Sequence, residues 1–193
     1  MMSPQEFKRQ WDMGGEPTVP VDGTRLSSLG LTLASIDFLI SAGLPDSAAP
    51  FLSFADTGAK STCYCVPLTK LYTFLSSEYD RYVSIGFDGA GNPLVIDTNE
   101  NDRIAWLDHE DDFAAVYVNS SLSSLAVFLL AYRDFVQALI SSKGDEAFLN
   151  GDFTDDDVDV LRTKLKEQDA RALQEDTFWN MELQTLLANR EHR

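Results

Sequence analysis

The chain has 193 residues, of which 44% are hydrophobic and 24% are charged, so it can form one complete core and its composition excludes disordered and fibrous proteins. Its 31 acidic and 15 basic residues give a formal net charge of −16, which disfavours nucleic acid and anionic membranes as partners. The charge favours a basic protein partner, for example a nuclease, although surplus carboxylates can also serve only to keep a protein soluble.

The sequence contains no uninterrupted apolar run near the roughly 20 residues that a membrane-spanning helix needs, and residues 1–11 lack the core of a signal peptide. We therefore expect a cytoplasmic protein. Cys63 and Cys65 are expected to be reduced thiols, because a disulfide at this spacing in a strand would be strained and zinc would need two further ligands. The sequence thus predicts no metal and no cofactor.

Two helices are predicted in the N-terminal part of the chain. Phe7 and Trp11 are four residues apart, as on one face of a helix, which Gly14-Gly15 would end. After an irregular segment at residues 16–28, Thr32 is a good cap for a second helix that stops before Gly43. The apolar face predicted for this second helix consists of Leu33, Ile36, Leu39 and Ile40.

Between residues 63 and 118 the hydrophobic pattern has the period of strands. The candidate strands are residues 64–68, 82–87, 93–96, 104–107 and 114–118. Residues 88–92 and 98–102 are rich in glycine, asparagine and aspartate and therefore predict tight hairpin turns. Because such short connections cannot contain a parallel crossover, the pattern predicts a twisted, mostly antiparallel sheet of about five or six strands.

Three further helices are predicted after the sheet. Asn119 or Ser120 would cap a long apolar helix that ends at residues 141–144. Thr154 would cap another helix with aspartates in its first turn, where they complement the helix dipole, and a last helix begins near Thr177. The predicted fold class is α+β. We expect residues 1–193 to form a single domain, with a C-terminal helical extension from about residue 154.

The segment Asp108-His109-Glu110-Asp111-Asp112 is the best candidate for chemistry. A histidine flanked by carboxylates can act as a general base or bind a metal, but adjacent residues point in different directions and no second histidine lies nearby. The other interpretations are a solvated turn and an acidic contact surface for a basic partner. The aromatic residues fall at helix and strand core positions, which indicates packing more than binding.

Short motifs follow one another in a characteristic order along the chain. They are Gly43-Leu44-Pro45, residues 50–54, Ile85-Gly86, residues 91–97, residues 107–109, residues 118–122, Asp169-Ala170, Ala172-Leu173 and Phe178-Trp179. In their order and spacing, from Phe7 to Leu187, the chain resembles the SUKH superfamily, and specifically its fourth immunity-protein subfamily. The chain departs from that family at Asn101-Asp102, where relatives usually have glycine.

The resemblance implies the same α+β layout and an immunity protein that neutralises a cognate bacterial toxin by binding and occluding it, without a reaction of its own. Our candidates for the toxin contact are Asp108, Glu110, Asp111 and Asp112, and residues 155–159 form a competing acidic patch. Two other functions stay open. One is a non-enzymatic regulatory scaffold, because fungal SUKH relatives act in cell-wall synthesis signalling, and the other is a hydrolase centred on His109.

Overall fold

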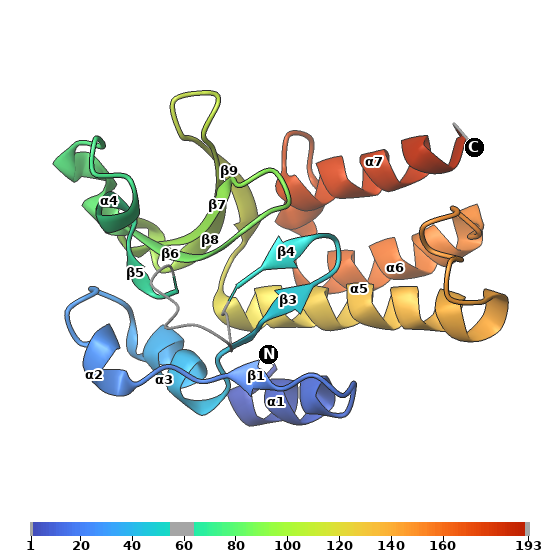
Figure 1. Cartoon of the computed structure of the whole chain (residues 1–193), viewed down its shortest axis with the longest axis horizontal. Helices are drawn as coiled ribbons and strands as arrows, with labels where there is room; N and C mark the ends of the chain where they lie inside the picture. The colour runs from blue at the N-terminus through green and yellow to red at the C-terminus, as the bar shows by residue number, and fades with distance from the viewer. Residues whose placement is uncertain (1, 55–63, 192–193) are drawn as a thin grey trace.

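The computed structural model describes residues 2–54 and 64–191, and Figure 1 shows a central sheet with helices on both sides. In the described part of the chain, the main sheet has seven strands in the order β3-β4-β6-β7-β8-β9, with β5 paired to β6, and all pairings are antiparallel. The strands are β3 (Ser47–Ala48), β4 (Leu52–Ser53), β5 (Val66–Pro67), β6 (Tyr82–Phe87), β7 (Pro93–Asp97), β8 (Arg103–Asp108) and β9 (Ala114–Asn119). The predicted α+β class and the meander of β6 to β9 are confirmed.

The short strands differ from the sequence prediction. Residues 64–68, predicted as one strand, form only the two-residue strand β5 before the chain enters the one-turn helix α4 (Leu68–Leu71). Strands β3 and β4, which no alternating pattern marks, form a hairpin that adds to β6 through the single pair Ser53 and Phe87. The sheet is therefore wider than predicted, because two-residue strands are too short to produce a period in the sequence.

Helices or turns cover both faces of the long strands, which explains why their sequences are almost continuously apolar. Alternate residues point to opposite faces. Leu94 and Ile96 of β7 enter the larger core, whereas Val95 between them enters the smaller core. The larger core is formed with α1 (Pro4–Asp12), α3 (Leu33–Ser41), α5 (Leu122–Lys143), α6 (Asp155–Gln168) and α7 (Phe178–Glu191). The smaller core lies under α4 and the short helix η1 (Ser77–Arg81).

The N-terminal helices form as predicted, but two details were wrong. The segment predicted as irregular contains β1 (Thr18–Val19), which pairs with β2 (Leu44–Pro45), and the one-turn helix α2 (Gly23–Leu26). Thr32 caps α3, yet Leu33 is 85% exposed and Ile40 is 44% exposed, whereas Phe38 and Leu39 are buried. The predicted face is therefore rotated, and the cap of α3 explains the rotation.

Asp102 fixes the orientation of α3 from the β7–β8 turn. Its Oδ2 accepts hydrogen bonds from the Thr32 backbone N–H at 2.7 Å and from the Thr32 hydroxyl at 2.6 Å. Asn101 and Asp102 both have positive φ, 54° and 60°, the backbone conformation that glycine adopts most easily. The Asp102 side chain thus ties a turn to a helix cap.

Two glycines in the family-like motifs allow close backbone approach. Gly43, after α3, has a φ of +70°, and a Cβ there would lie 2.0 Å from the Val19 carbonyl oxygen. Gly86 follows an irregularity in the β6–β7 register, and a Cβ there would lie 2.3 Å from the Ser53 carbonyl oxygen. Glycine is therefore required at both positions for packing of the chain rather than for chemistry.

Three of the other motifs meet in one buried hydrogen-bond network. The indole Nε1 of Trp179 in α7 donates to the Asn119 side-chain oxygen at 3.0 Å. Asp169, before the short helix η3 (Ala170–Leu173), accepts from the Ser120 backbone N–H at 2.8 Å and from the Ser124 hydroxyl at 3.2 Å. This network joins β9, the first turn of α5, η3 and α7, so these motif residues hold the helices against the sheet.

The C-terminal helices confirm most of the predicted boundaries. The N-cap of α5 is Ser121, whose hydroxyl accepts from the Ser124 N–H at 3.2 Å, and not Asn119 or Ser120, which join the buried network instead. Thr154 caps α6 in a capping box with Asp157, as its sequence indicates. By length and composition α5 could cross a membrane, but half of its most apolar stretch is buried inside the protein, which is how a core helix behaves.

Candidate functional site

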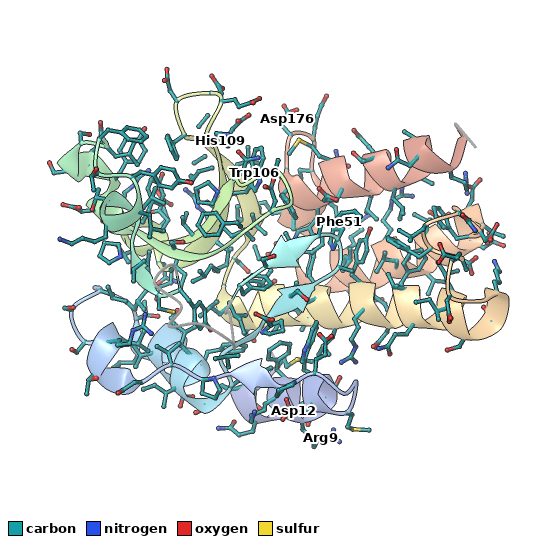
Figure 2. All side chains as sticks on the ribbon, viewed as in Figure 1. Arg9, Asp12, Phe51, Trp106, His109 and Asp176 are labelled. Atoms are coloured by element: carbon teal, nitrogen blue, oxygen red, sulfur yellow. The ribbon has the colours of Figure 1, made fainter. Side chains whose placement is uncertain are left out.

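The acidic turn, residues 108–112, connects β8 to β9 at an outer edge of the sheet, where Figure 2 labels His109. The carboxylate of half-buried Asp108 accepts a hydrogen bond from the Glu110 backbone N–H at 2.9 Å. Glu110, Asp111 and Asp112 are exposed, and their side chains make no hydrogen bond or ion pair with any residue that the structure describes. Three carboxylates in this turn are thus free to interact with a partner.

An aromatic patch lies beside this turn and consists of Tyr72, Phe74, Tyr79 and Phe113. Phe113, the residue after the turn, is buried in the smaller core, and its ring centroid lies 4.9 Å from Tyr72 and 6.1 Å from Phe74. Phe74 is 76% exposed. An exposed ring held by contacts with two other rings offers a large apolar surface that is already ordered.

The turn and the patch are joined directly. The hydroxyl of Tyr79 donates a hydrogen bond to the carbonyl oxygen of Asp112 at 3.0 Å. Asp112 and Phe113 have positive φ, 47° and 58°, a conformation that directs the Phe113 ring inward while the preceding acidic side chains remain outside. Aromatic groups surrounded by polar and charged ones are the usual composition of a protein-binding surface.

His109 is held by an amide and not by a carboxylate. The Asn92 side-chain oxygen accepts from the His109 backbone N–H at 3.0 Å and lies 2.6 Å from the ring Nδ1. Because that oxygen is an acceptor, Nδ1 carries the proton and Nε2 is the basic nitrogen of the neutral ring. Asn92 is in turn fixed by Asp88, which accepts from its Nδ2 at 3.0 Å. Within the described residues, no nucleophile is hydrogen-bonded to His109, so the arrangement orders two turns and gives no support to a hydrolase.

In the part of the chain that the structure describes, no group of three or more His, Cys, Asp or Glu side chains could hold a metal ion. Cys65 is buried, and burial raises the pKa of its thiol to about 12, so it is neutral at physiological pH. Cys63 lies outside the described residues.

Comparison with known proteins identifies the family. The family model described as SUKH-4 immunity protein matches residues 11–185. The chain belongs to the SUKH-4 immunity protein family. The match includes every strand of the described sheet and helices α2 to α6, together with the first half of α7. No curated protein and no solved structure is significantly similar to the chain.

The competing acidic patch of this SUKH-4 protein, residues 155–159, is largely neutralised by its own neighbours. Asp155 pairs with Arg190 at 2.7 Å, and Asp159 pairs with Arg162 at 2.6 Å. Asp157 completes the cap of α6, where hydrogen bonds from the backbone and the hydroxyl of Thr154 lower its pKa. Three of the four aspartates in this patch therefore have partners, whereas three of the four carboxylates in the acidic turn have none among the described residues.

Sequence reasoning located the acidic turn in this SUKH-4 protein but missed the aromatic patch. It assigned the aromatic residues to core positions, whereas Phe74 and Phe51 are among the most exposed apolar side chains in the described residues. Phe74 lies between α4 and η1, outside any periodic segment. The detectable signal was its position, because a phenylalanine in a short connection between helices has no helix face or strand face that could bury it.

Proposed function

We propose that this SUKH-4 protein is an immunity protein that binds a cognate toxin and blocks its active site, without catalysis and without a cofactor. The observation that carries the proposal is membership of the SUKH-4 immunity protein family over residues 11–185. The toxin is a basic protein, and a nuclease fits that description, because the chain carries a net charge of −16. We further propose that the protein acts in the cytoplasm of the cell that makes it.

The proposed contact consists of the acidic turn, with Asp108, Glu110, Asp111 and Asp112, and the adjoining aromatic patch. Free carboxylates attract a basic partner and speed association, and their effect decreases as salt screens them. Ordered aromatic rings that become buried on binding slow dissociation. Both contributions are available on this surface, since three of the acids have no partner in the described residues and Phe74 is largely exposed.

Co-expression of the chain with the toxin domain encoded beside its gene tests the function. We expect growth to be rescued and a one-to-one complex to survive purification. Rescue without a complex would contradict occlusion. An absence of any adjacent toxin gene, together with binding to a non-toxic partner, would favour the regulatory scaffold instead.

Two matched charge reversals test the surface. Asp111→Lys changes the acidic turn, whereas Asp156→Lys changes an exposed acid of the competing patch that makes no hydrogen bond or ion pair with the described residues. Both remove one negative charge and add a positive one, so any effect of total charge is equal. We expect Asp111→Lys to weaken the complex by about tenfold and Asp156→Lys to change it less than about twofold. The reverse order would move the contact to α6.

A further inference from the structure

A cleft of about 110 Å³ lies between the β3–β4 hairpin, the segment that joins α5 to α6, and α7. Figure 2 labels Phe51 on that hairpin, beside α7. The cleft has apolar walls, which include Tyr132, Phe153 and Leu186. Phe51 and Leu149, which also line it, are 69% and 51% exposed. The cleft therefore contains apolar surface that the free chain leaves in water, as binding sites do.

Glu182 contributes a carboxylate to this cleft from α7. It is half-buried, and none of the described residues donates a hydrogen bond to it or forms an ion pair with it. The cation at the same cleft, Arg190, is already occupied, because its guanidinium pairs with Asp155 at 2.7 Å and lies 5.6 Å from the centre of the Phe153 ring. Glu182 is thus a partly shielded carboxylate that is unpaired among the described residues and is available to a ligand that supplies a donor.

The groups around Glu182 favour a cation. Burial, and then the charge of Asp88 on the β6–β7 turn, raise the pKa of Glu182 to about 7. Burial alone would raise the pKa of Asp88 as well, but hydrogen bonds from Asn92 and Trp106 outweigh it and lower that pKa, so Asp88 is ionised. On the α5 side, burial and then the charge of Glu182 raise the pKa of Tyr132, which stays a neutral phenol. A positive group that entered the cleft would therefore meet the carboxyl of Glu182 and the neutral hydroxyl of Tyr132 in its walls, with the charge of Asp88 acting from outside the cleft and that of Arg190 already paired with Asp155.

We propose that this cleft binds an arginine side chain of a protein partner, with Glu182 as its counter-ion and the aromatic walls against its guanidinium and stem. A planar guanidinium stacks on aromatic rings and donates paired hydrogen bonds to a carboxylate, whereas an ammonium group is a hydrated point charge. The site differs from the acidic turn and the aromatic patch in residues and location. That the partner is a toxin rests on the proposed function, but the binding of arginine by the cleft does not.

Titration of the ¹⁵N-labelled full chain with Nα-acetyl-arginine methylamide tests the inference at pH 8.5. We expect saturable shifts at the amides of Thr185 and Asn189, which line the cleft, and weak or no shifts with the uncharged citrulline analogue. Glu182→Gln should weaken arginine binding at least about tenfold, because a charge-assisted pair is lost. Glu175→Gln, at an exposed glutamate that does not line the cleft, should leave binding unchanged.

Two further measurements sharpen the test. Lowering the pH from 8.5 to 5.5 should weaken binding roughly thirtyfold, because Glu182 must give up its proton to bind a cation. Phe51→Ala removes an exposed wall without affecting the core and should also weaken binding. Equal binding of citrulline, unchanged binding by Glu182→Gln, or no saturable shift would overturn the inference. No toxin is used in this titration. If the chain rescues growth but does not bind the probe, the immunity function stands and only the proposal of an arginine site in the cleft is wrong.

Discussion

Replacing Glu182 by glutamine should stabilise the protein at neutral and alkaline pH. The folded chain raises the pKa of this carboxyl from 4.5 to about 7, chiefly through burial. A folded-state pKa above the unfolded value means that the folded protein holds the proton more tightly. The contribution to stability is therefore complete below pH 4.5 and is lost as the pH rises through about 7.

The size of this stabilisation follows from the difference between the unfolded and folded pKa values of Glu182. Each pH unit between the two pKa values costs about 1.4 kcal/mol, so the full penalty approaches about 3 kcal/mol. Partial exposure of the side chain lets solvent screen the charge, which reduces the penalty to about 2 kcal/mol. Glutamine cannot ionise and therefore does not carry this free-energy penalty. We therefore expect Glu182→Gln to be more stable than the parent by about 2 kcal/mol at pH 8.5, and by about 1 kcal/mol less than that at pH 5.5.

Urea unfolding of both proteins at the two pH values, followed by tryptophan fluorescence, measures this difference. All other titrating groups are common to the pair and cancel. Glu175→Gln serves as the control, because it removes an exposed carboxyl and should give the same difference at both pH values. A difference between Glu182→Gln and the parent that does not change with pH would refute the burial of an unpaired carboxyl in the cleft.

The remaining predictions concern the two surfaces and the sheet. Phe74→Ala should raise the dissociation rate of the toxin complex about tenfold, measured by surface plasmon resonance, while changing the unfolding free energy by less than about 0.5 kcal/mol. Asp111→Lys should slow association several-fold at low salt in stopped-flow experiments, and a slowing that persists in about 1 M salt would exclude steering as its cause. Asp97→Asn should lower the unfolding free energy by about 3 kcal/mol in urea, because Asp97 is fully buried against Arg81 and Arg103. A loss below about 1 kcal/mol would mean that water hydrates these arginines well enough to compensate for the lost ion pairs.

The sequence predicted the elements that local physics determines. Strands β6 to β9 agree with the predicted ranges to within one residue at each end, because their apolar runs are bounded by turn residues. Thr32 and Thr154 cap their helices as predicted, since a cap depends on residues close in sequence. The face of α3 could not be predicted, because it depends on the hydrogen bonds between Thr32 and Asp102, far apart in the chain.

In the candidate site, too, local features could be predicted from the sequence, whereas contacts between distant segments could not. The acidic turn was identified from five consecutive polar residues between two strands, and the structure leaves three of its carboxylates without partners in the described residues. What distinguishes it from residues 155–159 was not visible in the sequence. Arg190, which neutralises Asp155, comes from a different helix. The pKa of Glu182 likewise depends on burial by other parts of the chain and then on the charge of Asp88 in a distant turn, so the local sequence gave no sign of it.

The acidic turn and the cleft at Glu182 differ in their effect on the stability of the free protein, and this difference determines how each would act in a complex. The carboxylates of the acidic turn are solvated, so they cost the free chain little and can attract a partner from a distance before contact. Glu182 is shielded, repelled by Asp88 and unpaired among the described residues, so it destabilises the free chain at neutral pH. A cation that pairs with it would remove that penalty only in the complex. The turn should therefore control the rate of association, whereas the cleft should control how long the partner stays bound.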